Sequence, residues 1–283
     1  MKILVTGGTG KVGRELAACL LKGGNEVDTV SRNPDAANLP EGVRLSKVDL
    51  SKPEQASSLA MKDIDAIFLN PGAVENAASE LLTRATRDGV KQAVLLSAIT
   101  VEYGGGYRRF AERFRAIEEI VRASGLEWTF LRSADFAANS AVWIPQILTG
   151  DVVRGAYGNA KTSPIHERDI ATMAAEAFKH KEEHVRKAYA ITGPESLSQF
   201  ERVRIIGEVI GRNLRFEEIP PELARAAMLA QGVPSEVPDR MLGYLSACLA
   251  EPGPTTTTVK KILGRSPLSF AQWVSEHKVM FGS

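Results

Sequence analysis

The glycines between residues 7 and 13 have the spacing of a loop that binds dinucleotides, and they directly follow the apolar run of residues 3–5. A strand that ends in such a loop and restarts as a helix near Lys11 points backbone N–H groups and the positive end of the helix at a pyrophosphate. Side chains on the glycines would block this approach. The sequence therefore predicts a cofactor-binding loop made by Gly7, Thr9, Gly10, Lys11, Val12 and Gly13.

The residues after the next apolar run, residues 27–30, bear on which nicotinamide cofactor binds. An acidic residue usually holds the ribose of NAD at this place, about 20 residues beyond the glycines. Here the chain has Ser31 and Arg32 instead. A guanidinium group can donate two charge-assisted hydrogen bonds to a 2′-phosphate, so this pair favours NADPH over NADH. The alternative for Arg32 is a solvated loop arginine.

Residues after the third and fourth apolar runs are expected to meet the adenosine half of the cofactor, because the carboxyl ends of parallel strands converge there. They are Asp49, Leu50, Asn70, Pro71 and Gly72. Each of them could instead serve only the local structure of its loop. Ser97 ends the fifth run, on the side expected for the nicotinamide. Its hydroxyl could hydrogen-bond cofactor or substrate, or it could satisfy a backbone group.

Six apolar segments alternate with helix-compatible stretches over the first 131 residues, which is the pattern of a parallel sheet with helices on both faces. They are residues 2–5, 27–30, 43–48, 66–69, 93–96 and 128–131. The longest helix is expected at about residues 107–123. The sequence therefore predicts an α/β protein with a doubly wound Rossmann sheet.

Three helix starts carry local signals. Ser51 is expected to cap one helix in a capping box with Glu54. Ser198 and Glu201 have the same spacing and predict a second capping box. Asp169 is expected to cap a third helix. These signals agree with the helices that the apolar pattern requires.

The alternation becomes irregular after residue 131, where glycines and prolines divide the chain into shorter segments. We expect an NAD(P)-binding Rossmann domain at residues 1–150. We expect a smaller, mostly helical substrate lobe at residues 151–283, with about 187–192 returning to the Rossmann sheet.

The composition is that of an ordinary globular protein. Of 283 residues, 44% are hydrophobic and 24% are charged, and the formal net charge is +1, so neither nucleic acid nor an anionic membrane is expected as a partner. The first apolar run is too short for a signal peptide, so we expect a cytoplasmic protein. Cys19 and Cys248 have no second cysteine or histidine at metal-binding spacing, so no metal site is expected.

Six stretches of the chain resemble the NmrA-like group of atypical short-chain dehydrogenase/reductases, which includes type-2 quinone oxidoreductases and triphenylmethane reductases. They are residues 6–13, 30–34, 123–132, 135–139, 163–171 and 259–265. The resemblance covers almost the whole chain and implies an NAD(P)H-dependent oxidoreductase. It does not specify the substrate, because one fold hosts many reactions.

The chain departs from the better-known branches of this superfamily, which carry a tyrosine and, four residues later, a lysine on the helix after the fifth strand. The sequence has no lysine between Lys91 and Lys161. Tyr157 and Lys161 have the right spacing, but they lie in a glycine-punctuated stretch beyond the sixth strand, where the two side chains would not share a helix face. We interpret this match as a coincidence.

The proton donor is therefore left open, with Tyr103, Tyr107 and Ser97 as weak candidates. A phenol needs a neighbouring cation to give up its proton readily, and Arg108 or Arg109 could supply one.

Three residues after the sixth strand, Phe136, Asn139 and Trp143, are expected to contact a flat substrate. The alternative, at least as strong for Trp143, is packing between the two parts of the protein. His166 is not assigned a catalytic role.

The leading hypothesis is an NADPH-dependent reductase that transfers hydride to a quinone-like or other conjugated small molecule. Such an acceptor needs less proton assistance from the protein, which makes the missing tyrosine and lysine tolerable. Two alternatives stay open: a tailoring reductase of one metabolite, and a redox-sensing regulator that binds NADP(H) and acts through a protein partner. The sequence leaves the oligomeric state open, with a homodimer among the options.

Overall fold

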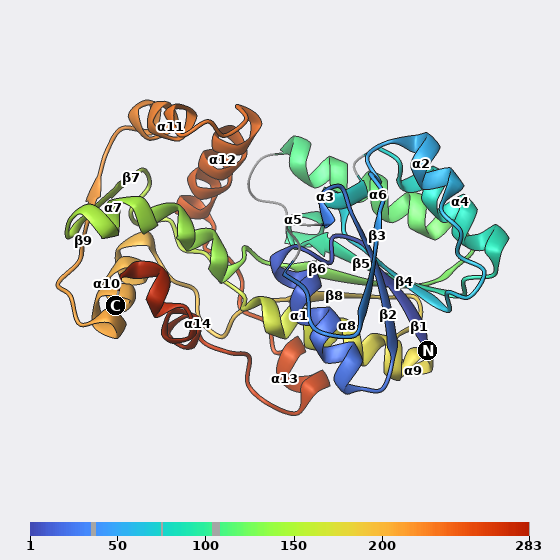
Figure 1. Ribbon diagram of the computed structural model, residues 1–283. Helices are drawn as coiled ribbons and strands as arrows, with labels where there is room; N and C mark the ends of the chain where they lie inside the picture. Colours follow the sequence, from blue (N-terminus) through green and yellow to red (C-terminus); the bar gives the residue numbers. More distant parts are fainter. Residues whose placement is uncertain (35–37, 75, 104–107, 283) are drawn as a thin grey trace. The chain divides into compact units, whose positions relative to one another are not determined.

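The computed structural model describes residues 1–34, 38–74, 76–103 and 108–282, which form two compact units (Figure 1). Both units are built from segments that alternate along the chain. Unit 1 comprises Met1–Ala98, Arg113–Ser133 and Glu167–Ala190, and unit 2 comprises Ile99–Glu112, Ala134–His166 and Ile191–Ser283.

A seven-stranded sheet is the centre of unit 1, and its strands follow the order β3-β2-β1-β4-β5-β6-β8. The strands are β1 (Lys2–Val5), β2 (Glu26–Ser31), β3 (Val43–Lys47), β4 (Ala66–Leu69), β5 (Gln92–Ala98), β6 (Glu127–Ser133) and β8 (Lys187–Ile191). Neighbouring strands from β3 to β6 pair in parallel. The predicted Rossmann sheet is confirmed, and the strand order reverses beside β1, which is where such sheets bind ligands.

The helices of this unit bury one apolar face each against the core of the sheet. They are α1 (Lys11–Lys22), α2 (Pro53–Ser58), α3 (Pro71–Val74), α4 (Ala78–Asp88), α6 (Arg108–Ala123, whose first turn up to Glu112 is counted with unit 2), α8 (Glu167–Lys179) and α9 (Lys181–His184). Leu4 joins a core that contains Leu81 of α4 and Val121 of α6. Helix α1 packs against α8. Residues 167–190 therefore belong to unit 1. The sequence pattern, which divides the chain after residue 150, assigns most of them to the substrate lobe.

Two predicted helix starts are wrong and one is confirmed. Helix α2 begins at Pro53 without a side-chain cap among the described residues, because the Ser51 hydroxyl donates instead to Asp49 Oδ1 at 2.7 Å. Helix α8 begins at Glu167, so Asp169 lies inside the first turn, where it is fully buried. The capping box of Ser198 is present at the start of α10.

Unit 2 contains mainly short helices around an aromatic core. Its elements are α5 (Thr100–Tyr103), η2 (Ala137–Trp143), α7 (Ile144–Thr149), β7 (Val152–Gly155), α10 (Gln199–Ile210), β9 (Arg215–Glu218), α11 (Pro221–Ala230), α12 (Glu236–Ala250), α13 (Thr258–Leu263), α14 (Phe270–Glu276) and η3 (Lys278–Phe281). Strands β7 and β9 pair in parallel as a small second sheet that the sequence pattern does not predict. Trp143, Trp273 and Phe270 belong to the core.

No helix in the described part of the chain is both long enough and apolar enough to cross a membrane. The same residues contain no group of three histidine, cysteine or acidic side chains that could hold a metal ion.

Candidate functional site

Thr6 fixes the end of β1 against the neighbouring strand. Its backbone N–H and its hydroxyl both donate to the carbonyl of Phe68, at 3.0 and 2.9 Å, and the hydroxyl oxygen accepts from the N–H of Asn70 at 2.8 Å. The side chain is completely buried. The glycine loop therefore starts from a rigid base at the carboxyl ends of β1 and β4.

The loop itself is held by contacts that only glycine permits. Gly7 has a φ of +69°, and the side-chain amide of Asn70 fills the space where a β-carbon would lie. A β-carbon on Gly13 would overlap the carbonyl of Gly7, so the first turn of α1 lies directly against the loop. Glycine is needed at these two positions because the helix and the loop pack so closely.

The charges around the amino end of α1 favour the binding of an anion. Gly10 is the N-cap residue; among the described residues no side chain caps the helix, and its first turn contains no acidic residue. Lys11 opens the helix, and partial burial lowers the pKa of its ammonium group while Glu167 acts to raise it. Val12 and Gly13 are buried on the inner side of the helix. The N–H groups of this turn and its positive end suit a pyrophosphate.

Arg32 follows β2 directly and its side chain is exposed. No carboxylate of the described residues forms an ion pair with it, while the Asp49 carboxylate is near enough for electrostatic attraction. The hydroxyl of Ser51, its backbone N–H and Arg32 hold the pKa of Asp49 below its ordinary value, with the hydroxyl hydrogen bond as the largest cause. Ser31 Oγ accepts the N–H of Asn33 at 3.1 Å. Arg32 is thus an exposed guanidinium directly after β2, and this group is able to donate charge-assisted hydrogen bonds to a phosphate.

The remaining residues of the predicted adenosine end differ in how accessible they are. Asn70 is half-buried and its side-chain oxygen accepts the N–H of Gly72 at 3.0 Å. Leu50 and Pro71 are buried, so they can offer at most an apolar wall. Thr9 is half-buried in the glycine loop.

Ser97 lies at the end of β5, but its hydroxyl is occupied. It donates to Glu118 Oε1 at 2.7 Å, and both side chains are only 1% exposed. Arg132 binds both carboxylate oxygens of Glu118, at 3.0 and 2.8 Å, and Arg122 lies 3.2 Å from one of them. These contacts favour the structural alternative for Ser97, because its one donor is directed into a buried ion-pair network.

Of the two tyrosine candidates, Tyr103 lies among the described residues. Tyr103 ends α5 and is 46% exposed. Tyr107 and the side chains of Arg108 and Arg109 lie outside the described residues.

The tyrosine and lysine with the superfamily's spacing lie in a turn, as expected. Tyr157 has a φ of +60° and packs beside Ala156 and Leu242. Lys161 is exposed in the same turn. The two residues therefore share no helix face.

The predicted substrate residues have three different environments in unit 2. Phe136 is half-buried and Asn139 is exposed. Trp143 is 6% exposed, with the Arg202 guanidinium 5.4 Å from its ring centroid and the ring of Phe216 at 6.3 Å. These contacts favour the packing alternative for Trp143.

Three residues of the site were not predicted from the sequence. Thr29 donates to the carbonyl of Val5 at 2.6 Å and lies against Gly8. Gln55 accepts the N–H of Asp49 at 2.7 Å, which fixes the loop after β3. Glu118 lies in a charged helix segment that looks like a solvated face in the sequence. The periodicity of α6 could have shown that Glu118 falls one turn from the apolar positions.

The sequence model of a family described as NAD(P)H-binding matches residues 7–181 of the chain. The protein belongs to this NAD(P)H-binding family. The match begins at the first glycine of the loop and includes strands β2 to β6 and the helices between them, while β1 and β8 lie just outside it. The cofactor expected from the sequence is thereby confirmed as a nicotinamide dinucleotide.

Two relatives are similar over their whole length. A (4-alkanoyl-5-oxo-2,5-dihydrofuran-3-yl)methyl phosphate reductase of Streptomyces griseus is 32% identical over 281 residues, which cover 99% of each chain. An NAD(P)H azoreductase of Xenophilus azovorans is 31% identical, again over 99% of each chain. The chain is therefore an NAD(P)H-dependent oxidoreductase.

A solved structure shows the same fold. It is the NADPH complex of an NADPH-dependent quinone oxidoreductase from Escherichia coli, with a TM-score of 0.79 and 20% identity over 98% of this chain and 99% of that chain. The fold that the resemblance implies is confirmed.

The residues of this NAD(P)H-binding protein fit the cofactor at two of its charged groups. The first turn of α1 can hold the pyrophosphate through backbone N–H groups, and Arg32 can pair with a phosphate on the ribose. When bound, the cofactor supplies a hydride. The chain's own contribution at these residues is to bind and orient it.

Proposed function

We propose that the protein is an NADPH-dependent reductase that passes hydride to a conjugated small-molecule acceptor. The observation that carries this proposal is Arg32, an exposed guanidinium at the end of β2 without an ion-pair partner among the described residues. A 2′-phosphate there gains charge-assisted hydrogen bonds that the NADH ribose lacks. The glycine loop supports either cofactor, so Arg32 provides the preference.

The conjugated acceptor is supported by the proton chemistry. The described residues hold no tyrosine and lysine pair on one helix face, so a strong, positioned proton donor is not part of the proposal. Hydride addition to a conjugated system leaves a delocalised anion, which water can protonate. The relatives agree in class, because one is named for azo reduction and the other for an oxo-dihydrofuran with an alkanoyl group.

Phe136 and Asn139 are the residues that we propose for contact with the acceptor. An accessible aromatic face can stack on a flat conjugated molecule, and an exposed amide can hydrogen-bond to its oxygen. Trp143 is left out because its ring already packs against Arg202 and Phe216.

The test is the kinetics of Phe136→Ala with NADPH and a panel of quinones, azo dyes and enones. We expect kcat/KM for the acceptor to fall about tenfold, since roughly 1–1.5 kcal/mol of aromatic contact is lost, while NADPH affinity is unchanged. Phe200→Ala is the matched control, because Phe200 is also a partly exposed aromatic residue of unit 2. Equal losses of kcat/KM in the two variants would show that Phe136 does not contact the acceptor.

A further inference from the structure

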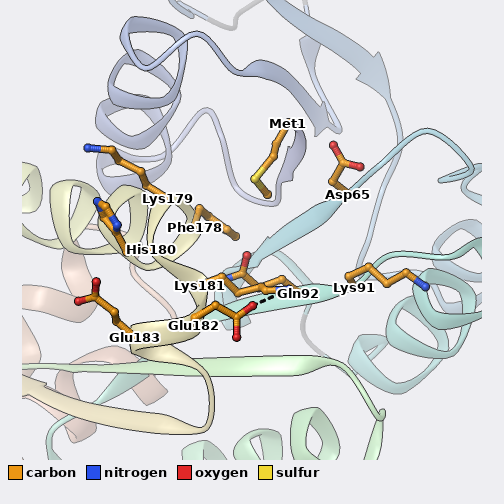
Figure 2. A pocket seen from close by; sticks show the side chains of 10 residues that line it. All are labelled: Met1, Asp65, Lys91, Gln92, Phe178, Lys179, His180, Lys181, Glu182 and Glu183. Carbon is orange, nitrogen blue, oxygen red and sulfur yellow. Dashed lines mark ion pairs between the residues drawn. The ribbon is translucent and has the colours of Figure 1, made fainter.

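Unit 1 contains a pocket of about 680 Å³ at the amino ends of its strands, opposite the strand ends that carry the glycine loop (Figure 2). Charges of both signs border it, with Lys91 and Lys179 against Asp65 and Glu183. Gln92 lies behind this rim and is only 2% exposed, so a ligand does not reach it. The pocket therefore selects neither a cation nor an anion. A buried arginine of unit 2 has better defined partners.

Arg202 of α10 binds both ends of the segment that carries the proposed acceptor residues. Its Nη1 donates to Asp135 Oδ2 at 3.1 Å, and its Nη2 donates to Ser140 Oγ at 2.7 Å. Asp135 directly precedes Phe136, and Ser140 directly follows Asn139. One guanidinium group therefore joins the two residues between which both proposed acceptor contacts lie.

Two aromatic rings and a threonine hold this guanidinium in place. Its central carbon lies 5.4 Å from the ring centroid of Trp143 and 5.2 Å from that of Phe270. Its Nη1 also donates to Thr162 Oγ1 at 3.1 Å, and the Thr162 hydroxyl donates to Asp135 Oδ2 at 3.0 Å. Arg202 is 4% exposed, so solvent screens these contacts little. The group is a fixed anchor, unlike an arginine on the surface.

The backbone fixes the first part of the segment by itself. The N–H of Ile165 donates to the carbonyl of Asp135, and its carbonyl accepts the N–H of Ala137, both at 2.9 Å. These two bonds flank Phe136. Further along, the N–H of Asn139 bonds within the segment, to the carbonyl of Phe136 at 2.9 Å. The hydrogen bond from Arg202 to Ser140 ties this later part of the segment to α10.

Stability gives little reason for a charged pair at this place. Arg202 Nε and Asp135 Oδ1 are both buried, and neither has a hydrogen-bond partner in the described part of the chain. Apolar side chains of similar volume can often replace a buried ion pair without loss of stability. They cannot supply two donors at a fixed angle, which is what the planar guanidinium offers to Asp135 and Ser140.

We propose that Arg202 is a positioning residue for the reduction, because it holds Asp135 and Ser140 at a fixed separation and thereby orients Phe136 and Asn139 toward the acceptor. The inference rests on the proposed function, since it takes these two residues as the acceptor contacts. Arg202 itself is buried, so it acts through them and not on the acceptor.

The main variant is Ser140→Ala, which removes one anchor and leaves Arg202 paired with Asp135. Kinetics are measured with the acceptor that the unmutated protein reduces fastest. We expect kcat/KM for this acceptor to fall about fivefold, because the contact residues are less well oriented, while the Kd of NADPH is unchanged.

Ser163→Ala is the matched control. Ser163 is another buried serine of unit 2, and its hydroxyl donates to the carbonyl of Gly253 at 2.9 Å. Both variants lose one buried hydrogen bond, so urea unfolding should show similar losses of stability. Ser163→Ala should nevertheless keep the kcat/KM of the unmutated protein.

Arg202→Lys provides a second variant at the other end of the contact. It keeps a positive charge near Asp135, but a single ammonium nitrogen replaces the two nitrogens that bind Asp135 and Ser140. We expect kcat/KM to fall at least as far as in Ser140→Ala, with circular dichroism to verify folding.

A double-mutant cycle separates positioning from a general loosening of unit 2. In a protein that already carries Phe136→Ala and Asn139→Ala, Ser140→Ala should change kcat/KM by no more than about twofold, because the residues to be oriented are gone. An equal loss in both backgrounds, the same loss in Ser163→Ala, or an unchanged kcat/KM in both Ser140→Ala and Arg202→Lys would overturn the positioning role alone. An unchanged kcat/KM in the Phe136→Ala and Asn139→Ala protein would overturn the proposed acceptor contacts, and the positioning role with them.

Discussion

The hydroxyl of Thr29 lies where a β-carbon on Gly8 would have to lie, and it donates to the carbonyl of Val5 at 2.6 Å. A side chain from β2 thus fills the space beside a glycine of the cofactor loop. Gly8 is not one of the three regularly spaced glycines, yet a β-carbon there would lie 2.2 Å from a side-chain oxygen, whereas at Gly13 the obstacle is the backbone carbonyl of Gly7.

Gly8→Ala should therefore lower the free energy of unfolding by roughly 1–3 kcal/mol through overpacking. In a double-mutant cycle with Thr29→Ala, the double variant should be about 1 kcal/mol more stable than the sum of the single effects, because Thr29→Ala removes the overlaps with Oγ1 and Cγ2 and leaves only the one with the β-carbon of residue 29. Urea unfolding measures all four proteins. Gly150→Ala, at an open position, is the control. Additive effects would show that the two residues do not interact as described.

Arg32→Ala should raise the Kd of NADPH about ten- to a hundredfold, which corresponds to roughly 1.5–3 kcal/mol of binding free energy. The Kd of NADH should stay nearly unchanged. The reason is that only NADPH carries the phosphate that the guanidinium would bind. Fluorescence titration of both cofactors checks this. Arg204→Ala removes an exposed arginine of unit 2 and should change neither affinity. Equal affinities of the unmutated protein for the two cofactors would refute the role of Arg32.

The ionisation of Glu118 should make the free energy of unfolding depend on pH in the acid range. Burial alone would raise its pKa, but the hydrogen bonds from Arg132 and Ser97 and the charges of Arg132 and Arg122 outweigh it, so the pKa lies below the ordinary value. A carboxyl group whose pKa is lower in the folded state stabilises the fold above its unfolded pKa of about 4.3. This stabilisation is lost as the pH falls through the folded pKa.

Glu118→Gln should accordingly lower the free energy of unfolding near pH 7 by roughly 1.5–3 kcal/mol, since charged hydrogen bonds are lost. The difference from the unmutated protein should shrink as the pH falls below about 4. Unfolding in urea over a pH series provides the comparison. Glu119→Gln, on the exposed face of the same helix, should have little effect at any pH. A difference that stays constant with pH would mean that Glu118 is not ionised in the network.

A Tyr157→Phe and Lys161→Met double substitution should change cofactor affinity and turnover by no more than a few fold. The two residues lie in a turn and share no helix face, so they cannot act as the superfamily's proton-donating pair. Steady-state kinetics with any active acceptor gives the answer, with circular dichroism to verify folding. A hundredfold loss of turnover in a folded protein would place the active site at this turn.

The sheet and the glycine loop are predictable from sequence because their signals are local. An apolar run, a glycine turn and an amphipathic helix each follow from spacing alone, and the six predicted strands overlap β1 to β6. The Ser51 cap is wrong because a hydroxyl has several acceptors within reach, and the loop geometry gives it to Asp49. Only the folded loop decides between them.

Contacts between distant segments account for the rest. β7 pairs with β9 across about 60 residues of sequence, and β9 has mostly exposed side chains, so neither strand has a clear alternating pattern. Glu118 resembles a surface residue until β6 brings Arg132 beside it. Such pairings have no signature in a single sequence.

The most direct test of the account follows hydride itself. NADPH that carries deuterium at the transferable position of its nicotinamide ring is incubated with the protein and an activated alkene, and the product is analysed by mass spectrometry. We expect one deuterium on a carbon of the reduced alkene, and we expect the same experiment with NADH to be much slower at limiting cofactor concentration. Tight NADPH binding without transfer to any acceptor of a broad panel, together with a protein partner whose binding depends on the redox state of the cofactor, would contradict it.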